Sequence, residues 1–270
     1  MAQTAEAIGT PVVFVHGLWL HADSWGAWID RFRDFGYAPV APGWPGDGST
    51  VEETREHPER VAGYGINEVV QHYVTAIDTL DAKPIAIGHS FGGLVVQRLL
   101  AEGHAAAAIA IDPAPIKGVV YTPPSALRVA SVALRNPANR KRAVALSRKQ
   151  FRYGFGNALT EAESNALFDR FTIPSPGKPL FEAVFANFSR RSPARVDTRN
   201  PDRGPLLLTA GLADHTVPPA TVRATRNRYR KSPASTDFVE FPRRGHTLAL
   251  DDGWPDVADT VLAWLKDHSL

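Results

Sequence analysis

Short apolar runs alternate along most of the chain with longer segments in which apolar residues recur every three or four positions. The runs predict buried strands and the recurring segments predict helices packed on a sheet. Strands that alternate with helices imply a parallel sheet covered on both faces. The fold class is therefore α/β, with six strands expected near residues 11–15, 38–41, 85–87, 105–111, 206–211 and 236–241.

The alternation of strand and helix patterns is interrupted between residues 113 and 205. Residues 129–146, 151–155, 161–171 and 180–188 have helical or loop-like patterns, and proline-containing breaks separate them. An insertion of this length between two strands predicts a lid. We expect a core of residues 1–112 and 205–270 with a helical lid of residues 113–204 inserted before the penultimate strand. Residues 52–64 are charged and are expected to be irregular.

The central stretch is PIAIGHSFGGLVVQRLL, residues 84–100, which predicts a strand, a sharp turn and a helix. Gly88 and Gly92 flank Ser90 by two positions on each side, where a turn this tight leaves no room for a Cβ atom. The first N–H groups of the helix point to where a negative oxygen would develop beside the serine. Ser90 is thus a candidate nucleophile. The alternative is an incidental glycine-rich turn, which seldom has this strand and helix around it.

A second glycine turn follows the first strand, in the sequence His16, Gly17, Leu18, Trp19. Gly17 allows the backbone to approach a neighbouring loop, so the N–H of Leu18 can face the Ser90 turn. The N–H of Leu18 is therefore a candidate oxyanion donor.

Asp214 and His246 follow later strands, in GLADHTVP and PRRGHTLAL. In open parallel sheets, ligand-binding and catalytic residues lie at the carboxyl ends of the strands. A serine hydroxyl needs an imidazole to take its proton and a carboxylate to hold that imidazole. Asp112, at the end of the strand near 105–111, is the alternative acid, and Asp214 is favoured. Among nine histidines, His246 is favoured because it lies in the loop after the last strand.

The composition excludes several classes of site. The chain has 270 residues and no cysteine, which excludes disulfides, thiolate metal sites and a cysteine nucleophile. No histidine or acid cluster has metal-ligand spacing, and no glycine-rich loop matches a phosphate or dinucleotide signature, so we expect no metal and no cofactor. With no basic leader and no long apolar run, we expect a soluble, unprocessed, cytoplasmic protein without a membrane span.

The charge is unevenly distributed. Residues 113–204 contain 16 Lys and Arg against 6 Asp and Glu, although the whole chain has a formal net charge of only +2. This basic block could steer anionic substrates or meet an anionic surface; a solvated helical face is the simpler interpretation. No nucleic-acid motif accompanies it, so we expect no nucleic-acid partner.

The stretches VFVHGLWLHADSW, GWPGDG, GHSFGGLVVQ, LADHTVP and RGHTL together resemble the α/β-hydrolases. Within that superfamily the chain resembles small lid-bearing serine esterases grouped with the cofactor-free haloperoxidases and perhydrolases. The resemblance implies Ser90 as nucleophile, His246 as base and Asp214 as its orienting acid, with an oxyanion hole formed by the N–H groups of Leu18 and Phe91. The usual N-terminal hairpin is missing, and the shortened sheet edge could support a homodimer.

The expected reaction is hydrolysis of a small, partly apolar carboxylic ester or lactone through an acyl-enzyme. Two alternatives stay open: oxygenation, perhydrolysis or carbon–carbon cleavage on the same triad, and a non-catalytic ligand receptor. The small-molecule substrate is expected to contact residues near the serine and from the lid, namely Trp19, His21, Trp44, His89, Phe151 and Phe155.

Overall fold

A computed structural model describes residues 9–120 and 123–270. Its main sheet has six strands in the order β2-β1-β3-β4-β7-β8, and every neighbouring pair is parallel. The six strands expected from the sequence are confirmed. Their bounds are β1 Pro11–Val15, β2 Ala38–Val40, β3 Ile85–His89, β4 Ala107–Ile111, β7 Leu206–Gly211 and β8 Thr236–Phe241.

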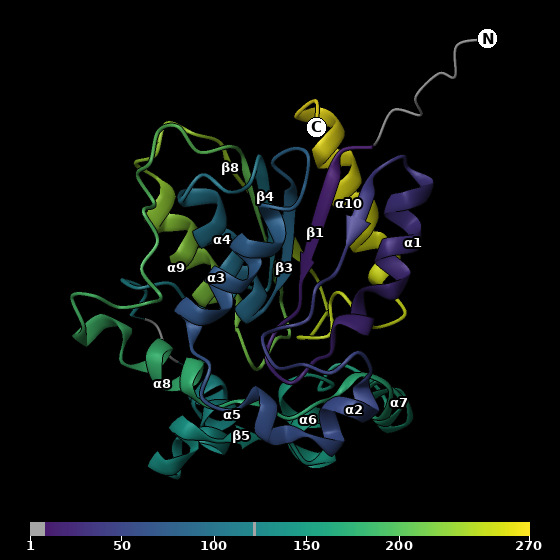
Figure 1. Cartoon of the computed structure of the whole chain (residues 1–270), viewed down its shortest axis with the longest axis vertical. Helices are drawn as coiled ribbons and strands as arrows, with labels where there is room; N and C mark the ends of the chain where they lie inside the picture. The colour runs from purple at the N-terminus through teal and green to yellow at the C-terminus, as the bar shows by residue number, and fades with distance from the viewer. Residues whose placement is uncertain (1–8, 121–122) are drawn as a thin grey trace.

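Helices cover both faces of this sheet (Figure 1). Because side chains alternate along a strand, Val12 and Phe14 of β1 face one layer, whereas Val13 and Val15 face the other. The first layer is formed by α1 (Gly26–Asp34) and α10 (Trp254–Asp267). The second is formed by α3 (Ile66–Ile77), α4 (Phe91–Ala101) and α9 (Pro219–Tyr229).

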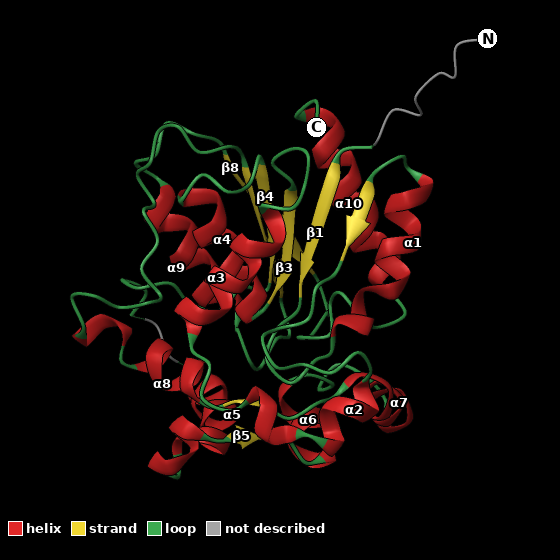
Figure 2. Cartoon of the chain, viewed as in Figure 1, coloured by secondary structure: helices red, strands yellow, loops and turns green. Residues whose placement is uncertain are grey.

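The segment between β4 and β7 forms a further layer beneath the carboxyl ends of the strands (Figures 1 and 2). Its position before the penultimate strand agrees with the predicted insertion, and its exact boundaries stay a prediction. A small antiparallel sheet of β5 and β6 within it was not expected. The elements are α5 Pro124–Leu134, η3 Pro137–Lys141, β5 Ala143–Val144, α6 Arg148–Gly154, α7 Glu161–Phe171, β6 Ser175–Pro176, α8 Lys178–Val184 and η4 Ala186–Phe188.

The stretch expected to be irregular, residues 52–64, is partly helical. It contains α2 (Val51–Glu56) and a short 3-10 helix, η2 (Pro58–Val61). Thr50 caps α2, because its side chain accepts a hydrogen bond from the N–H of Glu53. A second 3-10 helix, η1 (Ala22–Trp25), precedes α1.

Over residues 9–120 and 123–270, no helix combines the length and the apolar character needed to cross a bilayer. The cytoplasmic location and the homodimer stay predictions.

Candidate active site

Ser90 lies in a strained turn between β3 and α4. Its φ is 56° and its ψ is −118°, a left-handed conformation that a non-glycine residue rarely adopts. A Cβ atom on Gly88 would lie 2.3 Å from the carbonyl oxygen of Gly92, and one on Gly92 would lie 2.1 Å from that of Val15. The turn therefore requires glycine at both positions, as the sequence indicated.

The structure brings Ser90, His246 and Asp214 together from three separate loops. Nε2 of His246 lies 2.9 Å from Oγ of Ser90. Nδ1 of the same ring lies 2.6 Å from Oδ2 of Asp214. A carboxylate only accepts hydrogen bonds, so the Nδ1 proton points to Asp214 and Nε2 is left to accept the serine proton.

Backbone amides fix the Asp214 carboxylate. Its Oδ1 accepts hydrogen bonds from the N–H groups of Thr216, at 2.7 Å, and Val217, at 2.9 Å. Both the Asp214 and His246 side chains are fully buried. One carboxylate oxygen is thus held by the chain and the other holds the imidazole, which orients Nε2 toward the serine.

Asp112, the alternative acid, has a different partner. Its Oδ1 accepts a hydrogen bond of 2.7 Å from the N–H of Gly211, and among the described residues its buried Oδ2 has no partner. Burial, and then the charge of Asp214, raises the pKa of Asp112 well above its ordinary value. The geometry favours Asp214 as the acid that orients His246.

His89 lies beside these residues and packs its ring 4.6 Å from that of His246, between centroids. Its Nε2 donates to the carbonyl oxygen of His246 over 2.9 Å, since a carbonyl only accepts. Burial, followed by the His246 and His16 rings, holds the pKa of His89 well below its ordinary value. His89 is therefore a neutral support for the loop that carries His246.

One group of side chains in the described part of the chain has the geometry to hold a cation: His89, Asp112 and His246, with donor atoms within 4.8 Å of one another. Both ring nitrogens of His246 already meet Ser90 and Asp214. A cation that used either nitrogen would break one of these two contacts. The residues present therefore fit proton transfer better than metal binding.

The candidate oxyanion donors lie at the start of α4 and after β1. Within residues 9–120 and 123–270, the N–H groups of Phe91 and Leu18 have no hydrogen-bond acceptor. A Cβ atom on Gly17 would lie 2.8 Å from Cβ of Ser90, so this glycine permits the close approach of the two loops. Trp19, which directly follows Leu18, has a φ of 67°. This is a strained conformation that the sequence did not predict.

A cavity of about 230 Å³ adjoins Ser90. Leu18, Trp19 and Phe91 line the cavity beside Ser90. Side chains from the loop after β4, from α5, from α8, from η4 and from the loop after β7 form the rest of the wall. Most of the wall is apolar, and the insertion between β4 and β7 contributes small residues to it: Ala126, Ala130, Ala183 and Ala186. The space suits an apolar group attached to a carbonyl carbon at Ser90.

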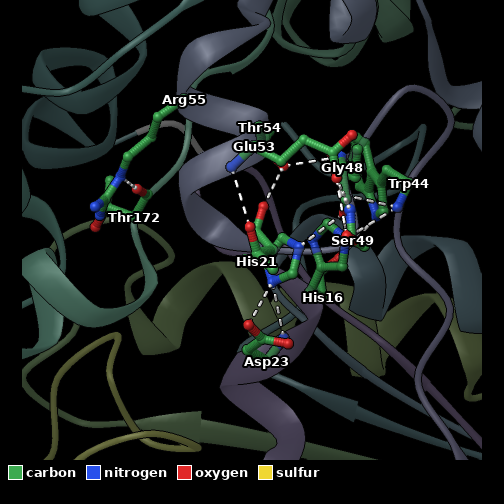
Figure 3. A network of polar contacts seen from close by, with 12 residues as sticks. His16, His21, Asp23, Trp44, Gly48, Ser49, Glu53, Thr54, Arg55 and Thr172 are labelled. Carbon is green, nitrogen blue, oxygen red and sulfur yellow. Dashed lines mark hydrogen bonds and ion pairs between the residues drawn. The ribbon is translucent and has the colours of Figure 1, made fainter.

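Of the residues predicted to contact substrate, Trp19 lines this cavity. Phe155 packs edge-on against the His246 ring, with centroids 4.8 Å apart, and Phe151 stacks on Phe155. Nε2 of His21 bonds the carbonyl oxygen of Gly48, and the N–H of Trp44 donates to Nε2 of His16 (Figure 3). These contacts support the surrounding loops, as those of His89 do. Contact with a substrate stays a prediction for five residues: His21, Trp44, His89, Phe151 and Phe155.

Most of the cavity residues that the sequence did not indicate come from the insertion between β4 and β7. They carry no polar motif, so only their position in the fold reveals them. Examples are Ile116, Val119, Val129, Leu180 and Val184.

The profile of the family described as "Alpha/beta hydrolase family" matches residues 12–260. The chain belongs to this family. The predicted superfamily is therefore confirmed, whereas the narrower haloperoxidase-like group stays a prediction. No curated protein matches the sequence.

Several solved structures share the α/β-hydrolase fold over nearly the whole chain. A monoacylglycerol lipase from Paleococcus ferrophilus is 24% identical, with a TM-score of 0.68 and coverage of 97% of each chain. A thermophilic esterase from Thermogutta terrifontis is 18% identical, with a TM-score of 0.66 and coverage of 97% of this chain and 91% of its own. A methylesterase from Arabidopsis is 14% identical, with a TM-score of 0.64 and coverage of 95% and 99%. At these identities the likeness concerns the fold.

Proposed function

We propose that the protein is a serine hydrolase that cleaves a carboxylic ester or lactone through an acyl-enzyme. The observation that carries this proposal is the contact chain from Ser90 through His246 to Asp214, with spacings of 2.9 and 2.6 Å, beside an apolar cavity. A hydroxyl, an imidazole and a carboxylate in this order activate the oxygen for attack on a carbonyl carbon.

In this mechanism Oγ of Ser90 forms a bond to the carbonyl carbon while its proton passes to Nε2 of His246. The N–H groups of Leu18 and Phe91 stabilise the resulting oxyanion, each by about 3 kcal/mol. Collapse of the tetrahedral species breaks the bond to the alkoxy oxygen, which takes the proton from His246. Water then attacks the acyl carbon by the same route and releases the acid.

The deciding experiment is labelling with a fluorophosphonate, followed by mass spectrometry of tryptic peptides. We expect an adduct on Ser90 that is lost in His246→Ala and kept in Ser24→Ala, a buried serine of η1. Absence of an adduct on the wild type would contradict a serine hydrolase.

Turnover of p-nitrophenyl esters separates the rival chemistries. Hydrolysis needs Ser90 as nucleophile, so Ser90→Ala should abolish it. A cofactor-free oxygenase needs mainly the His246 base, so its oxygenase activity would be reduced by Ser90→Ala but not abolished. A non-catalytic receptor would give negligible turnover in the wild type.

A further inference from the structure

Most of the large exposed apolar side chains in the described part of the chain lie on the insertion between β4 and β7, next to the cavity. The described chain has eight large hydrophobic residues that are exposed to solvent. Three are dispersed over the core. The other five form what we call the apolar patch: Val120, Leu127, Val184, Phe185 and Phe188.

Hydrogen bonds join the segments that carry the patch. Asn187 accepts from the N–H of Gly118, at 2.6 Å, and donates to the carbonyl oxygen of Val119, at 2.8 Å. This contact ties the loop before α5 to η4, and α5 packs beside α8 (Figure 1). The most exposed members are Val120, at 81%, and Phe188, at 86%. These side chains gain nothing from the fold and are available to another surface.

The patch is continuous with the cavity beside Ser90. Leu127 and Val184 belong to the patch and also line the cavity. A ligand that leaves an apolar phase through the patch would therefore reach the serine without crossing bulk water.

Basic residues surround the patch. Arg190 and Arg191 follow η4 and are exposed, and Lys117 lies beside them because its Nζ donates to the carbonyl oxygen of Ser189. The guanidinium group of Arg228, on α9, packs against Gly118. No Asp or Glu occurs between Asp112 and Glu161 or between Glu182 and Asp197. An apolar centre with a cationic rim complements an anionic phospholipid surface.

We propose that the apolar patch and its basic rim dock the protein on an anionic phospholipid bilayer, with the cavity mouth facing the lipid. Phe188 and its neighbours enter the interface while Arg190 and Arg191 meet phosphate groups. Under the proposed esterase function, the substrate is then an amphiphilic ester taken from the bilayer. Docking itself requires no hydrolysis, so the two proposals fail separately.

The test is cosedimentation of the full-length protein with vesicles, without substrate. We expect binding to phosphatidylcholine mixed with phosphatidylglycerol and little to phosphatidylcholine alone. Each cation removed should weaken binding about fivefold, so Arg190→Gln with Arg191→Gln should weaken it about 25-fold. Phe188→Ala should weaken binding about tenfold.

Matched controls lie away from the patch. Lys83→Gln with Lys266→Gln removes two exposed cations, one just before β3 and one in α10, and Phe35→Ala removes an exposed ring after α1. These variants should keep wild-type binding within about twofold, since they leave the patch and rim intact. Thermal unfolding of each variant checks that it is folded.

Three results would overturn the proposal. The wild type does not bind the anionic vesicles or binds neutral ones equally well; the control variants weaken binding as much as the patch variants; or Phe188→Ala converts a dimer to a monomer in sedimentation velocity while no vesicle binding occurs. The last result would assign the patch to a second copy of the chain.

Discussion

The backbone N–H of Trp19 donates a hydrogen bond of 2.6 Å to Oγ of Ser175, a residue 156 positions away in the insertion between β4 and β7. Two further contacts hold Trp19: its Nε1 donates to the carbonyl oxygen of Val144, and its own carbonyl oxygen accepts from Ile173. The insertion thus holds the strained residue that directly follows the candidate oxyanion donor Leu18. Oxyanion stabilisation depends on donors that are fixed before the reaction.

We predict that Ser175→Ala lowers kcat for ester hydrolysis about tenfold or more, because it leaves a buried N–H unpaired and frees the Trp19 backbone. KM should change little, since substrate binding does not use this bond. Ser175→Thr keeps an Oγ atom and should restore kcat. The matched control is Ser164→Ala, a buried serine of α7 whose Oγ has no partner among the described residues. Equal losses in Ser175→Ala and Ser164→Ala would contradict a positioning role.

The difference in contacts between Asp214 and Asp112 predicts unequal effects of removing their charges. Asp214→Asn should lower kcat/KM about ten-thousandfold, because the amide favours the wrong tautomer of His246. Asp112→Asn should have a far smaller effect, since Oδ1 of Asp112 serves the Gly211 amide. Steady-state kinetics on one ester measures both. A larger loss in Asp112→Asn would reverse the assignment of the acid.

The raised pKa of Asp112 makes a separate prediction for stability. Its unfolded pKa is about 3.9, and above this pH the native state retains a proton that the unfolded chain has released. The free energy of unfolding therefore falls as pH rises toward the folded pKa, by up to about 1.4 kcal/mol per pH unit. Asp112→Asn removes this loss and can still accept from Gly211 through Oδ1.

Urea denaturation of both proteins from pH 4 to pH 8 measures this effect. The stability of Asp112→Asn relative to the wild type should increase as pH rises, and groups common to both proteins, such as His89, cancel in the difference. Parallel curves would show that Asp112 has the same pKa folded and unfolded.

The sequence could predict that the three catalytic candidates lie close together, because this prediction needs only local sequence patterns. Apolar runs locate the strands, and a parallel sheet places all their carboxyl ends at one edge, so Ser90, Asp214 and His246 had to approach one another. The Trp19 to Ser175 contact has no such signal, since neither residue lies in a motif that fixes the other.

The cavity wall could not be predicted for another physical reason. Large aromatic residues such as Phe151 gain most when they are fully buried, and Phe151 has no exposed surface. Empty space next to Ser90 persists where small residues such as Ala183 fail to fill it. Aromatic residues such as Phe151 therefore indicated buried packing near Ser90 more than they indicated a substrate-binding surface.

The glycines of the Ser90 turn give a paired stability prediction. Gly92→Ala should destabilise the fold by more than about 3 kcal/mol, since its Cβ would lie 2.1 Å from the carbonyl oxygen of Val15. Gly26→Ala, at the start of α1, meets nothing within 4 Å and has a φ of −51°. It should stabilise the protein by about 0.5 to 1 kcal/mol. Thermal unfolding of both variants measures this difference in stability. Equal losses of stability in the two variants would contradict the prediction.

The small residues of the cavity wall predict how chain length is selected. Ala183 of α8 lines the space beside Ser90, and Ala183→Phe should fill much of it. Attack on the carbonyl needs only the part of the cavity nearest the serine, so turnover of p-nitrophenyl acetate should stay within about twofold. Turnover of p-nitrophenyl octanoate should fall at least about tenfold, because each excluded CH₂ forfeits about 0.8 kcal/mol of burial. If the ratio of octanoate to acetate kcat/KM is the same in variant and wild type, the acyl chain binds elsewhere.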